Sequence, residues 1–98
     1  MTLRREVIRA SGFVEPLPAE CVGQIRRIAK LIGAESLDSV SLRHLGRPAM
    51  VMLVDDLGHQ RLRPVNDGAT DLYHANCVPG TTHLIRGDVV ICPDGDFA

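Results

Sequence analysis

Two short stretches of the sequence are apolar at nearly every position, and they constrain the fold more than any other feature. Residues 49–56, AMVMLVDD, present apolar side chains to both faces of a strand, as central and covered strands do. Residues 87–92, GDVVIC, form a second buried strand. We expect the core to include Val51, Leu53, Val90 and Ile91. Helices must pack against a sheet that contains such strands, so the sequence predicts an α+β fold.

Weaker patterns predict the remaining strands. Apolar and polar residues alternate over 6–14 and again over 36–42, as they do in half-buried strands. The tight connection Asp56-Leu57-Gly58 follows the apolar strand and should lead into a strand at 59–65. These two strands would then form a hairpin.

Two helices complete the prediction. Residues 18–33 should form the longest helix, with Gly33 at its C-terminal end and an apolar stripe made by Val22, Ile25, Ala29 and Ile32. Asn66 should cap a short helix over 67–76, and residues 93–98 should form a polar tail. The predicted order is β-α-β-β-β-α-β, with a small antiparallel or mixed sheet and two helices.

Length and charge restrict the class of protein further. The 98 residues suit a single domain, 1–98. Eleven basic and 12 acidic residues give a net charge of −1, which argues against a sequence-independent nucleic-acid partner. Three cysteines without a C-x-x-C motif, no signal peptide and no long apolar run together predict a cytoplasmic protein with reduced thiols and no membrane span.

The second half of the chain resembles the phage and bacterial family known as domain of unknown function 3846. The resemblance is carried by the apolar strand MVMLVDDLG, by PVNDGATDLY (Pro64–Tyr73) and by IRGDVVI (Ile85–Ile91). It implies a small accessory protein carried by phages and their actinobacterial hosts. Because the function of that family is unknown, the resemblance implies no catalytic residue.

The corner between residues 61 and 76 is the first candidate site. Arginine side chains precede a helix N-terminus, where free N–H groups favour anions, and hydroxyl and amide groups lie nearby. The candidate ligand-binding residues are Arg61, Arg63, Asn66, Thr70 and Tyr73. The alternative is that the arginines pair internally with Asp67 or Asp71, which already favour the helix dipole.

A second constellation contains zinc-type ligands. His74, Cys77, His83 and Cys92 supply the right atoms, but their spacing lacks a paired knuckle, so the sequence does not decide whether they bind zinc. Cys92 at a strand end is alternatively a small buried hydrophobic residue. The sequence carries none of the common catalytic or nucleotide-binding motifs, so we expect no enzyme and no cofactor.

These observations favour a small non-enzymatic accessory protein of phage type. Its partner would be a host protein or a small anionic, nucleotide-like ligand, and it would act against a host defence. The alternatives are a structural interaction module, or a nucleic-acid-binding regulator using Arg26, Arg27 and Lys30 with the two arginines of the corner. The thin core and the unprotected edge predicted for 6–14 also suggest a homodimer.

Overall fold

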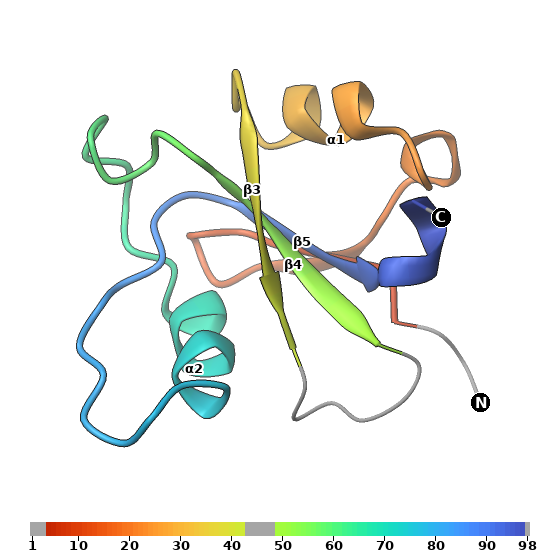
Figure 1. The fold of residues 1–98 in the computed structure, drawn as a ribbon. Helices are drawn as coiled ribbons and strands as arrows, with labels where there is room; N and C mark the ends of the chain where they lie inside the picture. The colour runs from red at the N-terminus through yellow and green to blue at the C-terminus, as the bar shows by residue number, and fades with distance from the viewer. Residues whose placement is uncertain (1–3, 43–48, 98) are drawn as a thin grey trace.

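A computed structural model describes residues 4–42 and 49–97 of the chain, and it shows one five-stranded antiparallel sheet with helices on both sides (Figure 1). The strands are β1 (Glu6–Ile8), β2 (Val14–Pro16), β3 (Leu37–Ser41), β4 (Met50–Asp55) and β5 (Val89–Pro93), and their order in the sheet is β2-β1-β5-β4-β3. The helices are α1 (Ile25–Leu31) and α2 (Asp67–Ala75), with short 3₁₀ turns η1 (Ala19–Cys21) and η3 (Asp94–Phe97). The predicted α+β class is confirmed.

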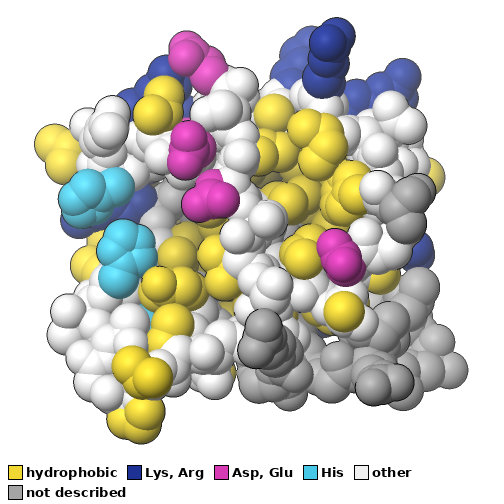
Figure 2. Space-filling model, viewed as in Figure 1, with side chains coloured by type: hydrophobic (Ala, Val, Ile, Leu, Met, Phe, Trp, Pro, Cys, Tyr) yellow, Lys and Arg dark blue, Asp and Glu magenta, His cyan; other side chains and the backbone are white. Residues whose placement is uncertain are grey.

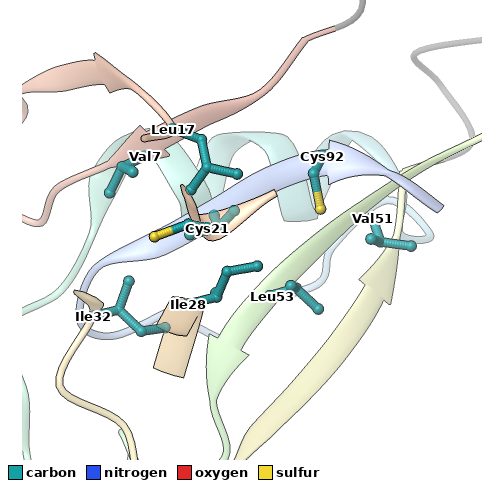
Figure 3. Close-up of a cluster of buried hydrophobic side chains, with 9 residues drawn as sticks. Val7, Leu17, Cys21, Ile28, Ile32, Val51, Leu53 and Cys92 are labelled. Carbon is teal, nitrogen blue, oxygen red and sulfur yellow. The ribbon is translucent and has the colours of Figure 1, made fainter. Parts of the chain in front are cut away.

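The two central strands are covered on both faces, because alternate side chains of β4 and β5 enter two separate cores. The core beneath α1 contains Val7, Leu17, Cys21, Ile28, Ile32, Val51, Leu53, Val90 and Cys92 (Figure 3). The core beneath α2 contains Ile8, Leu42, Met50, Met52, Ala69, Ile85, Val89 and Ile91. Val51, Leu53, Val90 and Ile91 are all buried, which confirms the predicted core residues.

The predicted strand 6–14 is in fact a hairpin of two short strands. Gly12 has a φ of 95°, and the Arg9 amide donates to the Phe13 carbonyl at 2.8 Å, so the chain reverses between β1 and β2. As a result, β1 is paired on both sides, with β2 and with β5. The outer strand β2 contains Pro16. Proline has no backbone N–H group to pair with a neighbouring strand, so it fits an edge strand.

The single helix predicted for 18–33 is wrong, because Gly23 interrupts it. This glycine has a φ of 70°, and the chain before it forms only the turn η1. Helix α1 therefore has seven residues and is shorter than α2, which has nine. The buried positions also differ from the predicted stripe: Ile28 is fully buried, whereas Ile25 is 46 % exposed.

The strand and hairpin predicted at 59–65 are also wrong, because both sides of β4 are already occupied. Strand β3 pairs with one side of β4 and β5 pairs with the other, which leaves no position for a third neighbour. Residues 56–62 form turns instead, in which Leu62 has a φ of 53°. Only Val65 makes a β-bridge in this stretch of the described chain, to Arg86.

The capped helix predicted at 67–76 is confirmed as α2. The Asn66 side chain accepts a hydrogen bond from the Ala69 amide at 3.0 Å, the geometry of an N-cap. Helix α2 lies on the face of the sheet opposite to α1 and is joined to the sheet by the segment that leads into β5 (Figure 1).

The C-terminal residues form η3 where a polar tail was predicted; Ala98 lies outside the described residues. Arg5 donates to both carboxylate oxygens of Asp96, at 2.7 and 2.8 Å, and this guanidinium lowers the pKa of Asp96. Phe97 packs against the core beneath α1. Within residues 4–42 and 49–97, no helix has the length and apolar character needed to cross a membrane.

Candidate binding surface at the free edge of the sheet

The arginines predicted to bind an anion are paired inside the protein. Arg63 donates from Nε to Asp55 Oδ2 at 2.6 Å and from its terminal nitrogen to the carbonyl of Gly33. The Asp55 side chain is only 1 % exposed, so Arg63 neutralises a buried charge. Arg61 pairs with Glu35 at 2.9 Å. The alternative of internal pairing holds, although the acidic partners are not Asp67 and Asp71.

Asn66 and Thr70 connect α2 to neighbouring backbone. The Asn66 amide donates to the carbonyls of Ile8 and Gly87 at 2.8 and 2.9 Å. The Thr70 hydroxyl accepts from the Ile85 amide at 3.0 Å. Both side chains are buried, so their polar atoms hold the fold together and do not face solvent.

Tyr73 lies on α2, one turn after Thr70. Its ring meets His83 edge-on at 5.7 Å, and a hydrogen bond with Cys77, helped by burial, raises the pKa of its hydroxyl. None of the five residues proposed from the sequence lines either of the two clefts that flank β3. Because Asn66 and Thr70 are buried and Arg61 and Arg63 are paired with acidic residues, the five side chains do not form one solvent-facing site.

The four zinc-type ligands are separated by the sheet. Cys92 is buried in the core beneath α1, and burial raises the pKa of its thiol to about 12. His74 lies on α2, where its Nε2 atom is 2.7 Å from the carbonyl of His83. Among the residues that the structure describes, no group of three or more His, Cys, Asp or Glu side chains is arranged to hold a metal ion.

One outer edge of the sheet is β3, which passes in front of β4 and β5 in Figure 1. The other is β2, which has three residues and contains Pro16. Among residues 4–42 and 49–97, no strand pairs with the outer side of β3. The Leu42 amide donates to the Met50 carbonyl, and the Asp56 amide donates to the Ser36 carbonyl. Hydrogen-bonded and non-hydrogen-bonded pairs alternate along antiparallel strands. The N–H and C=O groups of Leu37, Ser39 and Ser41 therefore point outward.

One of these outward groups is already occupied by a neighbouring side chain. The Ser39 amide donates to the Asp38 carboxylate at 2.9 Å. This local contact protects the centre of the edge in the free protein, as charged side chains commonly do on exposed strands. An incoming strand would have to replace it with a carbonyl oxygen.

An apolar groove runs along the α1 side of β3. It has a volume of about 360 Å³, and Leu53 and Val51 form part of its floor. Ile25 of α1 and Phe97 of η3 line it from the helical side, and Leu37 lines it from β3. The polar residues at its border are Asp38, Ser39 and Asp94. Figure 2 shows these hydrophobic side chains gathered to the right of the position of β3.

A smaller polar cleft lies on the other side of β3. Its volume is about 160 Å³, and its polar lining consists of Asp38, Asp55, Asp56, His59, His83 and Arg86. Figure 2 shows His and acidic side chains gathered to the left of β3. Arg86 donates to the carbonyl of Arg63 at 3.1 Å, whereas its buried Nε has no hydrogen-bond partner among the described residues.

The sequence did not reveal this surface. Residues 36–42 were predicted as a strand, but alternation does not show which strand lies at the edge, because that depends on pairings with distant residues. The signal available in the sequence was the polar character of Ser39 and Ser41, which share one face of the predicted strand. Comparison with known proteins adds no constraint, since no family model, curated protein or solved structure matches the chain. The resemblance to domain of unknown function 3846 stays a prediction.

Proposed function

We propose that this protein is a non-enzymatic binding module that captures an extended segment of a partner protein on the outer edge of β3. The observation that carries the proposal is the row of outward backbone groups on Leu37, Ser39 and Ser41, directly beside an apolar groove. Extended peptides commonly bind by adding a strand to such an edge, with alternate side chains in neighbouring pockets.

A protein segment fits this surface better than a small anion does. Arg63 pairs with the buried Asp55, so it is not available to bind phosphate. Arg61 pairs with the exposed Glu35, which leaves a single weakly paired arginine for an anion. The polar cleft beside β3 carries three aspartates, which would repel an anion. Its 160 Å³ is also small beside the roughly 300–1,000 Å³ of typical small-molecule sites.

The nucleic-acid alternative loses Arg63 to its ion pair with the buried Asp55, and the charge of Arg61 is offset in part by Glu35. Arg26, Arg27 and Lys30 remain exposed on α1, but three cations on a chain with a net charge of −1 form a weak electrostatic footprint. If the resemblance to a phage family is correct, the captured segment belongs to a host protein in the cytoplasm, and capture counters the function of that protein.

The proposal is tested by titrating ¹⁵N-labelled protein with a capped peptide of about eight alternating Val and Ser residues, a typical strand length. We expect amide shift changes centred on Leu37, Ser39 and Ser41. The substitution Ser39→Pro removes an outward N–H and leaves the inward ladder to β4 intact, so it should abolish binding. The control Ser39→Ala keeps the N–H and should bind as the wild type does.

A second measurement guards against a misfolded variant. An N-methylated copy of the peptide cannot donate to β3, so it should fail to bind the unaltered protein. Shift changes confined to other elements would contradict edge pairing. So would binding as tight as that of the wild type and the unmethylated peptide, either by the Ser39→Pro variant or by the N-methylated peptide.

A further inference from the structure

We infer that the segment captured by β3 alternates apolar and basic residues, with the apolar side chains in the groove and the basic side chains over the polar cleft. This inference rests on the proposed function and specifies the chemistry of the partner. The two clefts lie on opposite faces of the same strand: Leu37 packs on the core beneath α1 and lines the groove, whereas Val54 packs on the core beneath α2 and lines the polar cleft. Asp38 borders both clefts.

The alternation follows from strand geometry. Successive side chains of a strand point to opposite faces of the sheet, and a strand paired with β3 would continue the same two faces. Every second residue of that strand would therefore lie beside Ile25, Leu37 and Phe97. The residues between would lie beside Asp38 and the carboxylates next to it.

The charge of the polar cleft selects a basic side chain. Arg63 offsets Asp55 through their 2.6 Å ion pair, and Arg86 offsets one more of the three lining carboxylates. With neutral histidines, the three aspartates of the cleft together with Arg63 and Arg86 carry a net charge of −1. Asp38 and Asp56 have no ion-pair partner among the described residues, so they are open to a lysine or arginine.

The size and lining of the cleft fit the same class of side chain. Its 160 Å³ can receive the head of one side chain. The rings of His59 and His83, with centroids 6.2 Å apart, offer flat surfaces at one end. Guanidinium groups stack on such rings.

A second copy of this chain is a poorer occupant. If the β3 strands of two copies paired, Asp38 of both copies would lie on the joined edge, and like charges across paired strands are destabilising. Charge complementarity therefore favours a basic foreign segment over the chain itself.

The test compares three capped peptides of about eight residues in which Val alternates with Lys, Ser or Glu. We expect the Val–Lys peptide to bind about fivefold more tightly than the Val–Ser peptide at low salt, and the Val–Glu peptide to bind most weakly. The preference for Lys should shrink as salt rises from about 20 mM to about 0.5 M, because screening weakens exposed charge pairs.

Two charge-matched double variants locate the source of the preference. Asp38→Asn with Asp56→Asn should remove the preference for Lys over Ser. Glu20→Gln with Asp71→Asn changes the net charge equally at exposed positions away from both clefts and should keep it.

The possible outcomes separate the two proposals. Equal binding of all three peptides, or a preference for Lys that survives in the Asp38/Asp56 variant, overturns the inference and leaves edge capture standing. Failure of every peptide to shift the β3 amides overturns both. A dimer that Ser39→Pro dissociates would show that β3 pairs with a second copy, which overturns the foreign basic segment.

Discussion

Arg63 connects three separate parts of the chain, two through its guanidinium and one through its backbone carbonyl. It donates to Asp55 at the end of β4 and to the carbonyl of Gly33 after α1, and its own carbonyl accepts from Arg86. The sequence identified the residue as one of unusual importance, but it could not identify the partners. Asp55 is positioned by the end of β4 and Glu35 by the turn after α1, and neither position can be read from the local pattern.

Arg63→Ala should therefore lower the free energy of unfolding by on the order of 3 kcal/mol, because it leaves the Asp55 carboxylate buried without its cation. Arg61→Ala is the matched control. Its partner Glu35 is 74 % exposed, so the loss should be at most about 1 kcal/mol. Urea unfolding of the two variants checks this, and equal losses would contradict the structural role of Arg63.

Asn66 gives a second prediction for a single residue. Asn66→Ala removes the cap of α2 and leaves two buried carbonyls without donors, and each unpaired group costs about 1–3 kcal/mol. Gln24→Ala is the control, since Gln24 is the N-cap position of α1 but makes no side-chain cap bond with the described residues. Thermal unfolding should show a large loss for Asn66 and a change within about 0.5 kcal/mol for Gln24. Similar melting temperatures would argue against a central role for Asn66.

At the scale of elements, the sequence predicted α2 well and the stretch 18–33 poorly. Asn66 is a strong N-cap, so α2 has a local start signal. The stretch 18–33 has apolar residues that fit one helical stripe, and a lone glycine does not by itself predict a break. The break at Gly23 depends on η3, a distant element whose Asp96 carbonyl lies where a side chain at residue 23 would be.

Gly23→Ala should be more destabilising than Gly12→Ala. Both glycines have positive φ, so each alanine costs about 1 kcal/mol of backbone strain. No described atom lies within 4 Å of the added Cβ at Gly12, whereas at Gly23 the Asp96 carbonyl would be 2.8 Å away. Crowding of that kind costs roughly 1–3 kcal/mol more. Equal losses of unfolding free energy in the two variants, measured by denaturant unfolding, would show that the Asp96 carbonyl of η3 does not crowd a side chain at residue 23.

For the whole molecule, the sequence predicted the centre of the sheet and one of its two edges, and it missed the edge formed by β3. Strands β4 and β5 are apolar on both faces, and that local property follows directly from their place in the middle. Which strands lie outermost depends on long-range pairing. The stretch 6–14 was expected to provide a free edge. Glu6–Ile8 lies inside the sheet, but β2, which begins at Val14, is one outer strand, and β3 is the other. The homodimer inferred from the edge expected at 6–14 stays a prediction that light scattering can test.

The ion pair between Arg5 and Asp96 joins the two ends of the described chain, and the stability that it contributes should depend on pH. Arg5 lowers the pKa of Asp96 in the folded state, so the charged pair contributes stability above the unfolded pKa of roughly 3.9. That contribution is lost as the pH falls through the lower folded pKa. The stability difference between the wild type and Asp96→Asn should therefore be largest near neutral pH and shrink in acid. A difference that stays constant from about pH 6 to about pH 2 would contradict it.

The central claim is that the outer edge of β3 accepts another strand, and amide hydrogen exchange at individual residues tests it most directly. In the free protein, the outward amides of Leu37 and Ser41 should exchange faster than the inward amides of Val40 and Leu42. Addition of the Val–Lys peptide should slow Leu37, Ser39 and Ser41 together, because each outward N–H gains or exchanges a partner. Unchanged exchange at these three amides while the peptide is bound would place the ligand elsewhere and contradict the account.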